Sequence, residues 1–168
     1  MLINNFLDDE TFEDIYKIIT SNDMPWYTQA GATKEGDGQV LFTHVLINEQ
    51  QQVNSGLFET IGRPIVKKIK SIEPDFFRMI RMKINCLPNQ FKPIKSGYHT
   101  DLPASSNYKT LILSLNTNNG YTEFKDKKMP NFKSIKNSAC IFDGSKEHRS
   151  VSQTDAAYRW NINFNYEI

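Results

Sequence analysis

Residues 98–101, Tyr98-His99-Thr100-Asp101, are the stretch from which a fold and a site can be inferred for this chain. If the stretch is extended, its side chains alternate between two faces, so His99 and Asp101 point the same way and can share one cation. Thr100 then points away. A lone His-x-Asp also occurs often by chance, as a solvated or hydrogen-bonded pair, so a metal site needs a further ligand elsewhere in the chain.

His148 supplies the candidate third ligand, and Arg159 follows it eleven residues later. Two imidazoles and one carboxylate on one face of a metal leave other coordination positions open, which is the facial arrangement typical of non-haem Fe(II) sites. The order His-x-Asp, His, Arg therefore predicts a metal centre built from His99, Asp101 and His148. A third histidine, His44, lies in a predicted strand, where a hydrogen-bonded or surface role is more common than metal ligation.

The composition is that of an ordinary globular protein of about one domain. The chain has 168 residues, of which 39% are hydrophobic, 12% aromatic and 23% charged, enough to bury a core without disulfides. Lys and Arg number 20 against 19 Asp and Glu, so the net charge of +1 does not indicate nucleic acid or an anionic membrane as a partner. No apolar run approaches the ~20 residues that span a bilayer, and residues 1–5 lack the features of a signal peptide, so a cytoplasmic location is expected. Cys86 and Cys140 lie in apolar contexts and are expected to be buried free thiols.

Two segments near the start of the chain have helical periodicity. Residues 8–20 place apolar side chains at helical spacing after an acidic start, which predicts an amphipathic helix. Residues 50–71 carry a second helical pattern, which Gly62 and Pro64 are expected to kink or split.

After residue 71 the apolar pattern changes to the period of two that is typical of strands. One predicted strand, 41–47, comes before this point. The others are 81–87, 98–101, 110–115, 121–124, 138–142 and 159–166. Two helices and many short strands with turn signals predict an α+β fold whose main body is a β-sandwich or barrel.

The last predicted strand, residues 159–166, has two chemically different faces. The apolar face holds Trp160, Ile162, Phe164 and Tyr166, and the polar face holds Arg159, Asn161, Asn163 and Asn165. A side facing solvent and the polar wall of a cavity are both consistent with this pattern. Solvent-facing strands more often carry Lys, Glu and Thr than one Arg and three Asn, so the two interpretations stand level.

These residues resemble the 2-oxoglutarate- and Fe(II)-dependent oxygenases, whose core is a double-stranded β-helix, or jelly roll. The motif of that family is His-x-Asp, a distal His, and a basic residue roughly ten positions further on, here His99-Thr100-Asp101, His148 and Arg159. Residues 109–124, 141–144 and 161–166 are similar to the small members that recur in bacteriophage genomes. The likeness is strongest from about residue 81 to the C-terminus.

The resemblance implies one domain over residues 1–168, with helices in a lead-in over about 1–75 packed on one sheet of a jelly-roll core over about 78–168. It also implies that His99, Asp101 and His148 hold Fe(II). Arg159 would pair with the far carboxylate of the cosubstrate 2-oxoglutarate, a role that suits a planar guanidinium. Dioxygen would take a remaining metal position, and ascorbate would be a supporting reductant.

Two positions depart from the common pattern of the family. Many relatives have Tyr where Ser114 stands, and many have Arg-x-Ser where this chain has Arg159-Trp160-Asn161. Asn161 can still donate a hydrogen bond, and Ser114 is expected to act through a water. Both are therefore expected to assist Arg159 in binding the cosubstrate.

The loop 28–38, with residues 92–97, is expected to close over the metal as a lid.

The expected activity is a dioxygenase that couples decarboxylation of 2-oxoglutarate to succinate with hydroxylation of a peptide side chain, such as proline, or of a small metabolite. The alternatives are a catalytically degenerate member and a cupin-like or lectin-like jelly-roll binding module whose histidines are structural. Nucleobase demethylation would need a basic groove, which a net charge of +1 does not favour. If the chain is phage-encoded, the expected location is the host cytoplasm. The loops match no specificity motif, so no primary substrate and no oligomeric state is predicted.

Overall fold

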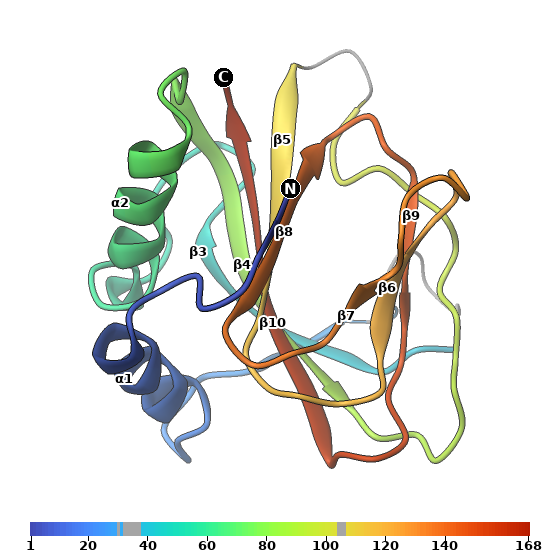
Figure 1. Ribbon diagram of the computed structural model, residues 1–168. Coiled ribbons are helices and arrows are strands. Elements are labelled where there is room, and N and C mark those ends of the chain that lie inside the picture. Colours follow the sequence, from blue (N-terminus) through green and yellow to red (C-terminus); the bar gives the residue numbers. More distant parts are fainter. Residues whose placement is uncertain (30, 32–37, 104–106) are drawn as a thin grey trace.

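The computed structural model describes residues 1–29, 31, 38–103 and 107–168. Within these residues the strands form two antiparallel sheets, and the helices cover the side of the larger sheet that faces away from the smaller one (Figure 1). The described part of the larger sheet has the order β1-β8-β5-β10-β4-β3-β2, and that of the smaller sheet β7-β6-β9. The elements are β1 (Leu2–Ile3), α1 (Asp9–Ile19), β2 (Tyr27–Gln29), β3 (Leu41–Ile47), η1 (Gly56–Phe58), α2 (Gly62–Ile72), β4 (Arg78–Pro88), β5 (Tyr108–Ser114), β6 (Tyr121–Phe124), β7 (Phe132–Lys133), β8 (Ser138–Asp143), β9 (His148–Val151) and β10 (Tyr158–Glu167).

The first predicted helix is confirmed as α1, and its start has a clear physical cause. The Asp8 side chain caps the helix by accepting a hydrogen bond of 2.9 Å from the Thr11 backbone N–H. Acidic residues in the first turn and a lysine in the last turn suit the helix dipole. Phe12, Ile15 and Ile19 form the buried stripe that faces the larger sheet.

The second helical segment is shorter than its periodicity predicts. The pattern is split, as expected, but residues 50–55 are not helical. Val53 instead forms a bridge with Ile47 of β3. The helix α2 begins at Gly62, where a side chain would collide with the Phe58 ring: a Cβ would lie 2.3 Å from a ring carbon. Pro64 is then tolerated in the first turn because that position needs no intrahelical N–H bond.

Most predicted strands are confirmed, but 98–101 is not a strand. Its extended part is limited to a single bridge between His99 and His148. Four strands carry too few residues for a visible pattern or lie where none was predicted, namely β1, β2, β7 and β9. The segment before residue 75 also contributes β1, β2 and β3 to the larger sheet, so that lead-in is not only helical.

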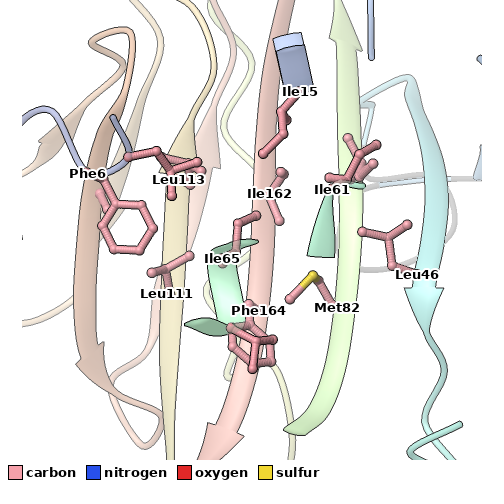
Figure 2. Packing of buried hydrophobic residues seen from close by; sticks show 14 of the residues in the cluster. Phe6, Ile15, Leu46, Ile61, Ile65, Met82, Leu111, Leu113, Ile162 and Phe164 are labelled. Atoms are coloured by element: carbon pink, nitrogen blue, oxygen red, sulfur yellow. The ribbon is translucent and has the colours of Figure 1, made fainter. Parts of the chain in front are cut away.

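The hydrophobic core lies in two layers on opposite faces of the larger sheet. The main layer fills the space between this sheet and the helices, where Ile15 and Ile65 lie against Ile162, Phe164 and their neighbours (Figure 2). A smaller cluster of Ile112, Phe124, Phe132, Cys140 and Phe142 lies between the two sheets. Because side chains alternate along a strand, β5 sends Leu111 and Leu113 to the first layer and Ile112 to the second.

The central strand β10 decides between the two interpretations of its polar face. Its apolar residues Ile162, Phe164 and Tyr166 are fully buried in the helix-side core. Arg159, Asn161, Asn163 and Asn165 are also buried, with exposed fractions of 8% or less. The polar face is therefore the wall of an enclosed space between the two sheets and not a solvent-facing surface.

Two further expectations are confirmed. Cys86 and Cys140 are buried free thiols, and burial raises the pKa of each to about 11. His44 is buried, and its ring nitrogens hydrogen-bond the Pro25 carbonyl at 2.9 Å and the Ser55 hydroxyl at 2.8 Å. Among the described residues, no helix has the length and apolar character needed to cross a membrane.

Candidate metal centre

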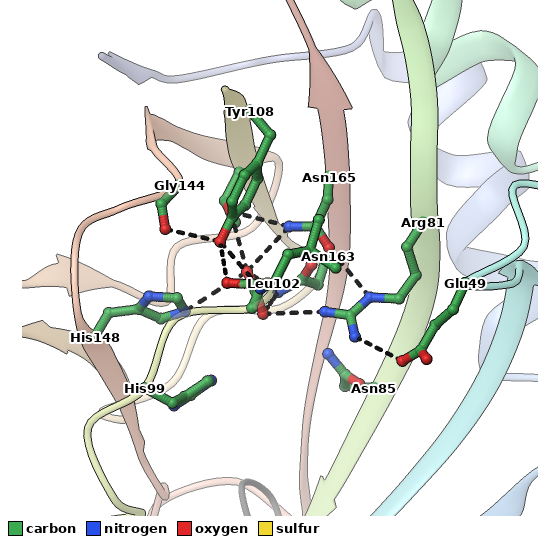
Figure 3. Close-up of polar contacts among 12 residues, drawn as sticks. Glu49, Arg81, Asn85, His99, Leu102, Tyr108, Gly144, His148, Asn163 and Asn165 are labelled. Atoms are coloured by element: carbon green, nitrogen blue, oxygen red, sulfur yellow. Dashed lines mark hydrogen bonds and ion pairs between the residues drawn. The ribbon is translucent and has the colours of Figure 1, made fainter. Parts of the chain in front are cut away.

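His99, Asp101 and His148 come together as the sequence predicts. One ligand atom from each lies within 4.8 Å of the others. Paired backbone hydrogen bonds hold the two histidines side by side, from His99 N–H to His148 C=O at 3.0 Å and from His148 N–H to His99 C=O at 2.9 Å. The ring centroids are 4.7 Å apart (Figure 3).

Both histidine rings are oriented by a backbone carbonyl two residues earlier. Nδ1 of His148 lies 3.1 Å from the Lys146 carbonyl, and Nδ1 of His99 lies 3.2 Å from the Gly97 carbonyl. A carbonyl can only accept, so Nδ1 carries the proton in each ring and Nε2 keeps its lone pair. Burial and the neighbouring His148 lower the pKa of His99, which favours the neutral form that a metal requires.

The Asp101 carboxylate is held by four side chains from the larger sheet. Asn163 donates to both of its oxygens at 3.1 and 3.2 Å, Asn165 donates at 3.1 Å, Thr110 at 3.0 Å and Arg81 at 3.3 Å. Burial alone would raise the pKa of Asp101, but the neighbouring His148, the charges of Arg81 and Lys83 and the hydrogen bond from Asn165 outweigh it and lower the pKa to about 2. The carboxylate is thus ionised and fixed in direction before any metal binds.

The chain after Asp101 is anchored by Tyr108. Its hydroxyl accepts a hydrogen bond from the Leu102 N–H at 3.0 Å and lies 2.8 Å from the Gly144 carbonyl, to which it donates (Figure 3). The Tyr108 ring lies over Gly144 so closely that a Cβ there would be 2.2 Å from a ring carbon. Gly144 therefore lets Tyr108 reach the loop that follows the metal-ligand candidate Asp101.

Arg159 is buried, and its partners among the described residues are hydroxyl groups. Nε donates to Ser134 at 2.8 Å, one terminal nitrogen to Ser150 at 2.8 Å and the other to Thr122 at 3.4 Å. No carboxylate of the described residues pairs with it within 4.0 Å. Burial lowers the pKa of Arg159 to about 10.

One cavity between the sheets joins Arg159 to the metal-ligand candidates. Its lining includes His99, Asp101 and His148 together with Arg159. Gly120 makes room for the arginine, because a Cβ there would lie 2.9 Å from Cδ of Arg159. The space therefore has a cluster of metal ligands and a buried cation in a single chamber.

Comparison with known proteins gives a consistent picture of the fold. No family model and no curated protein matches the sequence. Among solved structures, an oxidoreductase of the 2OG-Fe(II) oxygenase family from Burkholderia pseudomallei has a TM-score of 0.73 at 17% identity, over 99% of this chain and 84% of that one. A Pseudomonas putida prolyl-4-hydroxylase has a TM-score of 0.68 at 9% identity, over 99% and 91%. A prolyl hydroxylase from Trichoplax adhaerens, solved with a hypoxia-inducible-factor peptide, has 0.66 at 13%, over 99% and 82%.

The chain has the double-stranded β-helix fold of the 2-oxoglutarate/Fe(II) oxygenases. The expectation of an α+β jelly roll with helices packed on one sheet is thereby confirmed. In this oxygenase fold the three ligand candidates lie on the inner side of the two sheets, where they line one cavity with Arg159.

The residues fit both groups that the oxygenase fold implies. Two Nε2 atoms and an ionised carboxylate form the donor set that non-haem Fe(II) accepts. A buried guanidinium without a carboxylate partner among the described residues matches an anionic ligand, because an unpaired buried charge costs several kcal/mol. Arg159 lies on β10 four residues before Asn163, which donates to Asp101, so the two features are separated along that strand.

The two assisting residues expected from the sequence differ in their placement. Asn161 lines the cavity, and its Oδ1 accepts a hydrogen bond of 2.9 Å from Asn85. Ser114 is buried at the end of β5, and its hydroxyl donates to the Asn116 carbonyl at 3.2 Å. It is not among the lining residues of the cavity.

Several residues of the chamber were not predicted. Thr122 and Ser150 hold Arg159, and Lys83 and Asn85 extend the lining from β4. The alternation of polar residues in β4 was the available signal for Lys83 and Asn85, since Arg81, Lys83 and Asn85 share one face. Thr122 and Ser150 have no comparable signal.

The predicted lid has two parts with different outcomes. Residues 30 and 32–37 of the loop 28–38 lie outside the described residues. In the segment 92–97, Ile94 and Ser96 are tied to Ser150 and Ser152 of the neighbouring segment by four hydrogen bonds of 2.8 to 3.0 Å. These bonds favour a wall of the chamber over a lid for the segment 92–97, and its role in a lid stays a prediction that hydrogen exchange with and without cosubstrate would test.

Proposed function

We propose that this protein is a 2-oxoglutarate- and Fe(II)-dependent dioxygenase. The observation that carries the proposal is the joint lining of one cavity by three metal-ligand candidates and by a buried arginine without a carboxylate partner among the described residues. A jelly-roll binding module with structural histidines would have no use for this combination. The histidines would be free to pair with backbone groups on both nitrogens, and the arginine would be a costly buried charge.

In the proposed reaction His99, Asp101 and His148 hold Fe(II). The metal with its cosubstrate supplies an oxidant formed as 2-oxoglutarate is converted to succinate and CO₂, with dioxygen consumed. The chain supplies fixed geometry: Nδ1 of each histidine is engaged by a carbonyl, so both Nε2 atoms face the metal position. Asp101 stays ionised at neutral pH because its pKa is about 2.

Arg159 would bind the far carboxylate of 2-oxoglutarate. Ser150 and Thr122 accept hydrogen bonds from the guanidinium, which leaves their hydroxyl protons free to be donated to the same carboxylate. Asn161, which lines the same cavity, would assist. Ser114 would act only through a water, because it is outside the lining. Leu41, Leu87 and Ile112 give the cavity apolar walls that reduce access of water.

The substrate is proposed to be a peptide side chain or a small metabolite, and the product a hydroxylated one. Two of the similar structures are prolyl hydroxylases, one of them bound to a peptide, so a prolyl peptide is the first substrate to examine. Catalytic degeneration is the alternative, because Ser114 and Asn161 differ from the residues common in the family. It predicts metal binding without turnover.

The test is turnover of 2-oxoglutarate by the purified protein with Fe(II), ascorbate and air, measured as succinate. Wild type should form succinate slowly without substrate and faster with a suitable peptide or metabolite. Asp101→Ala should form none, whereas Asp23→Ala, a change at an exposed turn, should match wild type. Succinate formation that is equal in wild type and Asp101→Ala would refute the proposal.

A further inference from the structure

Lys83 lines the same cavity as the metal-ligand candidates, and in the function proposed above it binds neither the metal nor the cosubstrate. It stands in β4, where its neighbours in the sheet are Val45 of β3 and Asn163 of β10. Asn163 is the residue that donates to both oxygens of Asp101. Lys83 is therefore the neighbour, across the sheet, of a residue that holds the Asp101 carboxylate. It also lines the same cavity.

The Lys83 ammonium has no hydrogen bond and no ion pair with the described part of the chain. The nearby cation Arg81 is matched, because it pairs with Asp101 at 3.3 Å and with Glu49 at 3.5 Å. Burial and, second, the charge of Arg81 lower the pKa of Lys83, and the opposite effects of the Asp101 and Glu49 charges do not outweigh them. An anion that binds directly to the Lys83 ammonium would offset the cost of its burial and the repulsion from Arg81.

A second cleft reaches Lys83 from the outside. This cleft has a volume of about 390 Å³ and is lined by residues of β2, β3 and β4, among them Gln29, Thr43 and Arg81. Leu41 and Lys83 line both this cleft and the metal cavity. Lys83 therefore stands where a molecule entering through the cleft meets the metal cavity.

The charges of the cosubstrate are balanced in the proposed function without Lys83. In the proposed function, one carboxylate of 2-oxoglutarate faces Arg159 and the other faces the metal, so both of its negative charges are matched without Lys83. We infer that Lys83 binds a carboxylate of the organic substrate, which enters through the cleft lined by β2, β3 and β4. This inference rests on the proposed function and names its substrate class: a small acid, or a peptide with an acidic group near the oxidised position.

The experiment uses propionate as a probe of the acid class. The protein is loaded with Mn(II) and saturated with 2-oxoglutarate, and the paramagnetic relaxation of the propionate methyl protons is titrated. Wild type should show saturable relaxation that persists at saturating 2-oxoglutarate. Lys83→Gln should weaken propionate at least tenfold and leave 2-oxoglutarate affinity within twofold. Lys83→Arg should restore part of the binding, and Lys67→Gln, at an exposed position of α2, should match wild type.

The outcomes distinguish a failure of the Lys83 inference from a failure of the proposed function. Equal propionate binding by wild type and Lys83→Gln would overturn the role of Lys83. Loss of the propionate effect in wild type as 2-oxoglutarate saturates would also overturn it, since propionate would then occupy the cosubstrate position. Failure of wild type to bind 2-oxoglutarate at all would instead refute the proposed function.

Discussion

Arg159 is a buried cation, and the side chains that contact it through hydrogen bonds in the described structure are neutral. Three hydroxyl groups satisfy some of its five N–H donors, but they do not neutralise its charge. Removing a guanidinium from water is costly unless an anion pairs with it. In the proposed function the far carboxylate of 2-oxoglutarate would offset this cost, and it would therefore supply a large part of the affinity for the cosubstrate.

Arg159→Gln is expected to weaken 2-oxoglutarate by about 2 to 4 kcal/mol, because it removes a charge-assisted pair in a partly desolvated pocket. Mn(II) affinity should be unchanged, since the hydrogen bonds of Arg159 to the described residues go to Ser134, Ser150 and Thr122 and not to a ligand candidate. Isothermal titration of both ligands measures this. Arg63→Gln is the control, because the partner of Arg63 among the described residues is Glu59, in an exposed ion pair. Equal cosubstrate affinity in wild type and Arg159→Gln would exclude the role.

Thr110 tests whether the contacts of Asp101 prepare the metal site. Its hydroxyl donates to Asp101 at 3.0 Å and accepts from Asn165 at 2.9 Å, and Thr110→Val removes both bonds with little change of shape. Metal affinity should fall about tenfold, the lower end of what loss of such a supporting contact costs. Thr122→Val makes the same change beside Arg159 and should leave metal affinity intact. A Thr110→Val variant with wild-type Mn(II) affinity would show that Asp101 needs no such support.

The residues that carry strong chemical signals were predictable, and those that support them were not. His99, Asp101, His148 and Arg159 combine unusual residue types with a fixed order along the chain. Thr122 and Ser150 are common residue types whose roles depend on which strand lies across from β10. That information arises only when the two sheets face each other.

At the level of the elements, Glu123 joins two strands of the smaller sheet. It lies on β6 and accepts a hydrogen bond of 2.7 Å from Arg149 on β9, and it also pairs with Lys127 at 3.1 Å and Lys95 at 3.4 Å. The Arg149 guanidinium in turn lies over the Tyr98 ring at 4.2 Å. This cluster fixes β9, which begins at the metal-ligand candidate His148, against β6.

Glu123→Gln is expected to change the acid stability of the protein. Burial raises the pKa of Glu123, but Arg149 and Lys127 outweigh this and lower the pKa from 4.5 to about 2. The unfolded state therefore binds more protons between these values, and stability falls as the pH falls through them. Urea unfolding should show a smaller loss between pH 5 and 2 in Glu123→Gln than in wild type. Glu13→Gln, which removes an exposed ion pair with Lys136, should keep the wild-type slope. Identical slopes in wild type and Glu123→Gln would count against the cluster.

Element prediction failed where tertiary contacts override local pattern. Val53 continues the helical spacing of residues 50–71, yet it pairs with Ile47 across a turn in which Gln51 has a φ of 64°. The strands β1 and β7 have two residues each, too few to show a period of two. Long amphipathic segments such as β10 and α1 were predictable because a whole face of each is buried.

In the whole molecule, the larger sheet separates the main hydrophobic core, on the side of the helices, from the cavity that holds the candidate site residues. The strand β10 contributes to both, with Ile162 and Phe164 toward the helices and Arg159 and Asn161 toward the cavity. A defect in the helix-side layer should therefore lower stability without directly removing a site residue.

Ile162→Ala is expected to lower the free energy of unfolding by about 2 to 5 kcal/mol, because Ile162 is fully buried and its loss leaves a cavity. Mn(II) affinity measured well below the unfolding temperature should stay within a few-fold of wild type. Val53→Ala is the control, since Val53 is 55% exposed. Loss of metal binding in a folded Ile162→Ala protein would show that the two layers are coupled.

The most direct test of the central claim is the stoichiometry of metal-dependent 2-oxoglutarate binding, measured by calorimetry without dioxygen. Wild type should bind one Mn(II) per chain and then one 2-oxoglutarate, with cosubstrate binding much weakened when metal is absent. His148→Ala should lose stoichiometric Mn(II) binding at micromolar metal and, with it, the metal-dependent part of cosubstrate binding. Stoichiometric metal binding retained by His148→Ala, or 2-oxoglutarate binding by wild type that is indifferent to metal, would contradict the account.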